Sequence, residues 1–110
     1  MNQPINFITD AEFDEQVLNA SHLVIVNFWA DWCGKCKMID PLLEEVVLEV
    51  GDRVTIYKVD LDSEPKLSER FPLFHVPALL FFKNGQMCDE ITASVPKKLL
   101  LEKITNHTTT

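Results

Sequence analysis

The sequence predicts an α/β fold in which a central mixed sheet of about five strands is flanked by about four helices. Two features of the sequence carry this prediction. Helical and strand patterns alternate from residue 5 to residue 70, which favours parallel strands joined by helices on both faces of the sheet. An Asn84-Gly85 pair then separates two adjacent strand patterns, and such a pair favours a tight turn between antiparallel strands.

The size and composition indicate one folded domain over residues 1–110. Of the 110 residues, 46% are hydrophobic and 25% are charged, so the chain is too apolar to be disordered and long enough to bury a core. The sequence contains no internal repeat and no linker-like segment. We therefore expect a single domain that works as a monomer.

The charge and the spacing of apolar residues argue against two classes of partner. With 17 acidic and 10 basic residues and a net charge of -7, the chain has no basic cluster for nucleic acid or for anionic lipid. Its longest apolar stretches, Leu23–Ala30 and Val76–Phe82, are shorter than the roughly 18–20 residues of a membrane-spanning helix. Residues 1–10 do not resemble a secretory signal, so we expect a cytoplasmic protein.

The first three elements are expected to be a strand, a helix and a strand. A short strand over Ile5–Ile8 precedes a helix over Asp10–Asn19. The segment Thr9–Glu12 has the sequence of a capping box and marks the start of this helix. The run Leu23–Trp29 is apolar without alternation, as expected of a strand buried on both faces. Residues expected to face inward from the first helix are Phe13 and Val17.

The middle of the chain is expected to form a long helix, a strand and a short helix. The helix covers Cys33–Val50 and bends near Pro41, which removes one backbone hydrogen bond. A strand over Val54–Asp60 and a helix over Glu64–Arg70 follow. The apolar stripe of the long helix is Met38, Ile39, Leu42, Leu43, Val46, Val47 and Val50.

The last third is expected to contain a hairpin and a final helix. After a loop over Phe71–Val76, strands over Ala78–Lys83 and Gln86–Ile91 enclose the Asn-Gly turn. A helix follows over Pro96–Asn106, and the terminal residues Thr108–Thr110 are expected to fray.

The most specific chemical signal is the segment Trp32-Cys-Gly-Lys-Cys36. Two cysteines with this spacing lie within reach of each other when they begin a helix directly after a buried strand. Cys33 then lies where the amide groups and positive pole of the helix favour a thiolate, which is the attacking form. Cys36 lies a turn further in and is expected to resolve the mixed disulfide that Cys33 forms.

Two other interpretations of the cysteine pair find less support. A structural zinc site needs four ligands, and only Cys88 and three singly placed histidines remain to complete one, so we expect no metal. Two cysteines buried only for packing are also conceivable, but their position between a strand and a helix start argues against this.

With these motifs the sequence resembles the thioredoxin family along nearly the whole chain. The matching segments follow one another in family order and at family spacing. They are Phe28–Ile39, Pro41, Lys58–Asp62, Val76-Pro77 and Phe82–Gly85.

The resemblance implies a thioredoxin fold and a set of roles. Cys33 would be the nucleophile, Cys36 the resolving thiol, and Pro77 a cis-proline beside the disulfide. Trp32, Val76, Pro77 and Ala93 would form the surface that docks substrates. The family further implies protein disulfides as substrates, a flavin-dependent thioredoxin reductase as the recycling partner, and no bound cofactor.

The first departure from the family is Lys35, which stands where thioredoxins usually carry proline after the residue that is Gly34 here. A lysine near Cys33 should stabilise its thiolate and therefore the reduced form of the pair. We expect a more oxidising couple than the ~-270 mV of thioredoxin.

The second departure is Asn27, which stands where thioredoxins carry a buried aspartate beneath the disulfide. That aspartate is held to relay the proton of the resolving cysteine, and an amide cannot do so because it does not titrate. We expect slower resolution by Cys36. Lys58, the family's nearby cation, is expected to lose its carboxylate partner, with Asp60 and Asp62 too far away to replace it.

Two further residues have open roles. His75 precedes Val76-Pro77 where many thioredoxins have glycine, and it is either a plain loop residue or a group that affects docking. Cys88 follows the hairpin turn and is expected to be a structural or surface thiol.

The sequence thus predicts a thiol–disulfide oxidoreductase that reduces protein disulfides through Cys33 and Cys36. Lys35 favours an alternative in which the same pair works as an oxidase or isomerase at a raised potential. Asn27 and His75 favour a third interpretation, a thioredoxin-like binding or chaperone module. The presence of both cysteines argues against that third interpretation.

Overall fold

The structure, a computed structural model, describes residues 5–71, 75–92 and 95–108. Its centre is a five-stranded sheet in the order β1-β3-β2-β4-β5. The strands are β1 (Asn6–Phe7), β2 (Leu23–Trp29), β3 (Val54–Asp60), β4 (Ala78–Lys83) and β5 (Gln86–Ile91). The helices are α1 (Asp10–Phe13), which continues as a π-helical turn over Asp14–Leu18, α2 (Gly34–Val50), α3 (Pro65–Arg70) and α4 (Lys97–Thr108).

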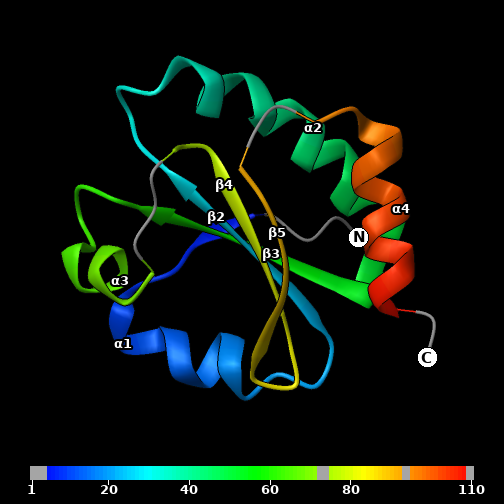
Figure 1. Cartoon of the computed structure of the whole chain (residues 1–110), viewed down its shortest axis with the longest axis horizontal. Helices are drawn as coiled ribbons and strands as arrows, with labels where there is room; N and C mark the ends of the chain where they lie inside the picture. Colours follow the sequence, from blue (N-terminus) through cyan, green and yellow to red (C-terminus); the bar gives the residue numbers. More distant parts are fainter. Residues whose placement is uncertain (1–4, 72–74, 93–94, 109–110) are drawn as a thin grey trace.

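The sheet is mixed, and helices cover both of its faces (Figure 1). β3 pairs in parallel with β1 and β2, whereas β4 pairs antiparallel with β2 and β5. Helices α2 and α4 pack on one face, and α1 and α3 pack on the other. The predicted α/β fold with a mixed sheet is therefore confirmed.

β2 lies in the middle of the sheet, and this position explains why apolar and polar residues do not alternate along it. Leu23 and Ile25 pack in the core under α2 and α4, while Val24, Val26 and Phe28 pack in the core over α1 and α3. Because both faces are covered, both sets of side chains must be apolar. Asn27 is the exception on this strand, since its side chain is polar and fully buried.

The first strand and helix differ from the sequence prediction in extent. β1 has two residues, Asn6 and Phe7, which pair with Tyr57 and Lys58 of β3 at the edge of the sheet. The second half of the predicted first helix is helical, but its residues Asp14–Leu18 have the wider π-helical form. At its start, Glu12 accepts a hydrogen bond from the backbone N–H of Thr9 at 3.1 Å, as the capping box predicts.

The long helix α2 runs through Pro41 without interruption. Its predicted stripe is confirmed for Ile39, Leu43, Val46, Val47 and Val50, which are buried. The prediction of Met38 as a core residue is wrong, since this residue is 79% exposed. The reason is angular, because Met38 precedes Ile39 by about 100° around the helix and so lies outside the face that packs on the sheet.

The end of α4 also differs from the prediction. The prediction that Thr108–Thr110 fray is wrong for Thr108, which belongs to the helix and whose hydroxyl donates a hydrogen bond to the carbonyl of Ile104 at 2.9 Å. Thr109 and Thr110 lie outside the described residues. Lys83 Nζ of β4 donates to the carbonyl of His107 at 2.6 Å. Contacts from outside the helix thus hold its last turn, which local sequence does not reveal.

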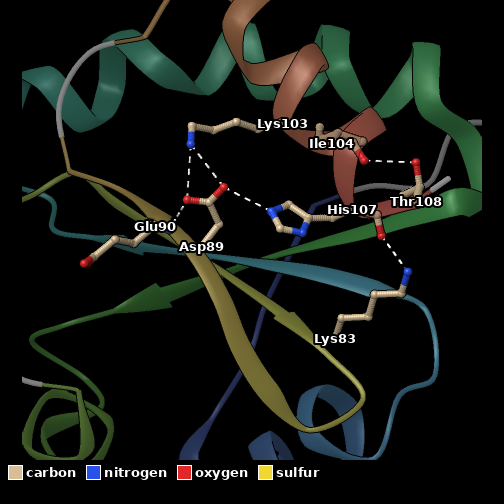
Figure 2. A network of polar contacts seen from close by, with 7 residues as sticks. All are labelled: Lys83, Asp89, Glu90, Lys103, Ile104, His107 and Thr108. Carbon is tan, nitrogen blue, oxygen red and sulfur yellow. Dashed lines mark hydrogen bonds and ion pairs between the residues drawn. The ribbon is translucent and has the colours of Figure 1, made fainter. Parts of the chain in front are cut away.

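A cluster of charged side chains ties α4 to β5 (Figure 2). Asp89 of β5 accepts hydrogen bonds from Lys103 Nζ at 3.2 and 3.1 Å, and its Oδ2 lies 3.0 Å from His107 Nε2. Burial by itself raises the pKa of Asp89, but the hydrogen bonds from His107 and Lys103 outweigh it and hold this pKa below its ordinary value. The folded state is therefore favoured by an ionised Asp89.

Asp89→Asn is expected to lower the free energy of unfolding by about 1–2 kcal/mol at neutral pH. The stabilisation is fully present above the unfolded pKa of about 3.9 and is lost as the pH falls through the lower pKa of the folded state. Urea unfolding across the acid range should show the variant and the wild type converging at low pH. The neighbouring exposed Glu90→Gln is the control, and a loss for Asp89→Asn that does not shrink with acidification would contradict the prediction.

Among the described residues, no helix is both long and apolar enough to cross a membrane.

Candidate active site

The two cysteines lie where β2 leads into α2. Cys33 is the N-cap of α2, and its Sγ accepts a hydrogen bond from the backbone N–H of Cys36 at 3.1 Å. The two residues form a disulfide, with their Cα atoms 5.3 Å apart. After reduction, the same N–H group and the positive pole of the helix are placed to stabilise a thiolate at Cys33.

The two sulfur-bearing residues differ in access to solvent. Cys36 is fully buried, whereas 7% of Cys33 is exposed, so Cys33 is the cysteine that a second molecule can reach. Both belong to a small cluster with Ala30 at the edge of the core. The arrangement fits an exchange in which Cys33 attacks first and Cys36 follows from behind.

The rim of the site contains most of the residues expected to dock substrates. Trp29 and Val76 pack against the cysteine cluster, and the peptide bond between Val76 and Pro77 is cis. Trp32 lies directly before Cys33 and is 69% exposed. Ala93, which the family resemblance adds to this surface, lies outside the described residues.

The first turn of α2 beside Cys33 is open to solvent. Gly34 and Lys35 are exposed, and a Cβ on Gly34 would meet no atom within 4 Å. A shallow hollow of about 180 Å³ lies next to this turn, and its lining includes Lys35 and Met38. The surface around Cys33 therefore combines exposed apolar side chains with the exposed ammonium of Lys35.

The expectation for Lys58 is wrong, because this lysine does have a carboxylate partner. Its Nζ lies 3.0 Å from Oδ2 of Asp40 on α2, and both side chains are largely buried. Asp60 instead accepts hydrogen bonds from the N–H of Asp62 at 3.0 Å and the hydroxyl of Ser63 at 3.1 Å. The sequence analysis did not identify Asp40 as a site residue. Its position four residues after Cys36 places both side chains on the same side of α2, and this spacing could have pointed to it.

Lys58 is also enclosed by two aromatic rings. Its Nζ lies 5.3 Å from the centroid of the Trp29 ring and 5.6 Å from that of Phe7. Such contacts with ring faces favour a cation. The Lys58 ammonium is thus held in one place between β1, β2 and α2.

The remaining candidate groups lie apart from this site. Cys88 is a free, exposed thiol on the edge strand β5, and partial burial together with the charge of Asp89 raises its pKa. His75 is exposed just before Val76. Within residues 5–71, 75–92 and 95–108, no group of three or more His, Cys, Asp or Glu side chains is arranged to hold a metal ion.

Comparison with known proteins agrees with this geometry. The family model described as Thioredoxin matches residues 4–106. The chain is 37% identical over 100 residues to Thioredoxin 1 of Synechococcus elongatus and 39% identical over 100 residues to thioredoxin of Staphylococcus aureus. Each match covers 91% of this chain and 94% of the relative. The crystal structure of Malassezia sympodialis thioredoxin (Mala s 13) superposes with a TM-score of 0.87 at 35% identity, over 99% of this chain and 96% of that one.

Proposed function

This chain belongs to the thioredoxin family and is a protein-disulfide reductase; we propose that it works in the cytoplasm and is recharged by a flavin-dependent thioredoxin reductase. The observation that best supports this reaction is the position of Cys33 at the start of α2, where its Sγ accepts a hydrogen bond from the backbone N–H of Cys36. Thioredoxins act on disulfide-containing proteins.

The reaction proceeds in two exchanges. The Cys33 thiolate attacks one sulfur of a substrate disulfide, forms a mixed disulfide and releases the other substrate sulfur as a thiolate. Cys36 then attacks Cys33, forms the Cys33–Cys36 disulfide and releases the second substrate thiolate. The substrate gains two electrons and takes up two protons, and the protein loses the same number of each.

We further propose that substrates dock across the apolar rim of Cys33. Trp32 and Met38 are large apolar side chains that are mostly exposed, and such side chains on a surface commonly mark a contact site. Val76 and Pro77 border the proposed surface, and the family resemblance adds Ala93, which lies outside the described residues. Apolar contacts of this kind do not depend on one particular sequence, so they accept many different peptides, which suits a general reductase.

The proposal is tested by following NADPH oxidation in a mixture of this protein, a flavin-dependent thioredoxin reductase and insulin. Turnover that depends on all three components is expected. Insulin reduction by dithiothreitol-loaded protein without turnover of NADPH would refute the proposed partner while leaving the exchange reaction intact. Absence of insulin reduction in both formats would favour a binding module instead.

Lys35 is expected to make the pair more oxidising than that of a thioredoxin with proline at this position. Lys35→Pro is expected to lower the reduction potential toward ~-270 mV, because it removes a cation that favours the Cys33 thiolate. The measurement is equilibration with defined thiol buffers, with Cys88→Ala in every protein to exclude the third thiol. Lys35→Met separates the loss of charge from the stiffness of proline.

The result also tests the alternative direction of exchange. A wild-type potential near -200 mV or above would favour an oxidase or isomerase, whereas a value near ~-270 mV would favour a reductant. An unchanged potential in both Lys35 variants would show that solvent screens this exposed ammonium.

A further inference from the structure

Asp40 is a largely buried carboxylate that none of the steps above uses. It lies on α2 one turn after Cys36, and side chains four residues apart on a helix lie on the same side, with Cβ atoms about 5–6 Å apart. Oδ2 of Asp40 pairs with Lys58 Nζ at 3.0 Å. The exposed fractions of the two side chains are only 23% and 16%, so solvent screens this pair weakly.

The second oxygen of Asp40 is unusual for a buried polar atom. Oδ1 is buried and accepts no hydrogen bond from any residue that the structure describes. Leaving a buried acceptor unpaired is costly, and buried carboxylates normally use both oxygens. One oxygen of Asp40 is thus occupied by Lys58, and the other is free to accept a proton.

Asn27 lies in the same region but cannot perform this task. It is the strand partner of Lys58, and it is buried on the sheet face that α2 covers. Neither its amide nitrogen nor its amide oxygen has a hydrogen-bond partner within the described ranges. An amide has no proton that titrates, so Asn27 cannot take up a proton, whereas the Asp40 carboxylate, one turn after Cys36 on α2, can.

The exchange reaction requires such a group. Cys36 is fully buried, and burial in apolar surroundings favours the neutral thiol, which is not the attacking form. The thiol must therefore lose its proton before Cys36 can attack Cys33. A carboxylate within reach, directly or through one water molecule, can take this proton.

We propose that Asp40, held in place by Lys58, accepts the proton of the Cys36 thiol as Cys36 attacks the mixed disulfide at Cys33. This inference rests on the dithiol exchange described above and adds a residue to it. The bond between Cys33 and the substrate sulfur breaks, the Cys33–Cys36 bond forms, and the substrate sulfur leaves as a thiolate. The proton stays on Asp40 until solvent or the departing thiolate removes it.

The charges around Asp40 fit this role. From β3, the Lys58 ammonium faces it and fixes one oxygen. The neighbours of that ammonium on β1 and β2 are the uncharged rings of Phe7 and Trp29. Along α2 itself, Lys37 and Glu44 are exposed, and Lys37 pairs with Asp31 at 3.7 Å.

The experiment distinguishes the reaction of Cys33 from that of Cys36 because the two steps follow one another in time. Reduced protein carrying Cys88→Ala is mixed with an excess of an aromatic disulfide whose thiolate product is coloured. The first release of colour reports attack by Cys33, and the second reports resolution by Cys36. Asp40→Asn is expected to slow the second release about tenfold or more near neutral pH, with the first release unchanged. The difference should shrink at high pH, where the Cys36 thiol ionises without help.

The matched control is Glu44→Gln, which removes an exposed carboxylate from the same helix. Equal slowing of the second release in both variants, or a slowing by Asp40→Asn that does not depend on pH, would overturn the proposal. The double variant Asn27→Asp with Asp40→Asn should restore the second release, because it returns a carboxylate to the strand partner of Lys58. If the wild type released no second thiolate, the dithiol exchange itself would be refuted, which is a separate outcome.

A measurement on the wild type keeps the proposal testable if Asp40→Asn does not fold. The side-chain carboxyl carbon of Asp40 is followed by NMR as the pH changes, in the oxidised and in the reduced protein. Two groups that exchange a proton titrate as a coupled pair, so the midpoint of the Asp40 signal should differ between the two states. Identical midpoints would overturn the proposal.

Discussion

Cys33→Ser is expected to lower the rate of insulin reduction by about a thousandfold or more, because a hydroxyl at this position does not ionise to an attacking group near neutral pH. The fold should survive the change, since serine is nearly isosteric and Cys33 keeps a small exposed fraction. The measurement is insulin reduction with dithiothreitol-loaded protein. A hydroxyl can still accept the N–H of Cys36 as an N-cap, so the helix start is preserved.

Cys36→Ser should fail in a different way. Cys33 can still attack, but without a resolving thiol the mixed disulfide persists, so covalent complexes with substrate proteins accumulate and are visible on non-reducing gels. Cys88→Ser is the control for a third thiol and should keep full activity, because Cys88 lies outside the cysteine cluster. Activity in Cys33→Ser, or an equal loss in Cys88→Ser, would contradict the assignment of the attacking sulfur.

Phe13→Ala is expected to destabilise the fold by about 3–5 kcal/mol. The Phe13 ring is fully buried, with its centroid 5.2 Å from that of Phe71 and 5.6 Å from that of Phe82. The guanidinium of Arg70 lies over the same ring at 5.0 Å. Truncation therefore leaves a cavity between α1, the end of α3 and β4, and the rings around it lose their edge contacts.

Urea unfolding at a constant m-value measures this loss. The matched control is Phe7→Ala, since 55% of Phe7 is exposed, and it should cost about 1 kcal/mol or less. Equal costs at the two positions would contradict the importance of the aromatic cluster under β2 and β4. A change in m-value would instead point to an altered denatured state.

Elements whose pattern is local were predicted closely. The bounds of β2, β3, β4 and β5 match the sequence prediction, because apolar runs and the Asn-Gly turn specify them without help from the rest of the chain. The turn itself has both residues at positive φ, 53° for Asn84 and 81° for Gly85, which this pair tolerates well. The placement of Cys33 at a helix start followed from the same local signals.

Features that depend on a partner far along the chain were not predicted. Thr108 stays helical in a last turn that Lys83 also contacts, and β1 has only the two residues that pair with Tyr57 and Lys58 of β3. Met38 satisfies a helical spacing, but the sheet lies on another side of α2. In each case the deciding group comes from another element, which a local pattern cannot contain.

By itself, the sequence determined the mixed α/β architecture, the redox-active pair Cys33 and Cys36, and the family, because apolar periodicity and a short motif encode them locally. Only the tertiary structure decided which buried charges pair with each other. Lys58 on β3 finds Asp40 on α2, 18 positions away in the chain, because the sheet register and the seating of the helix bring them to 3.0 Å. Burial then gives that pair its strength, since the same two charges in water would attract each other only weakly.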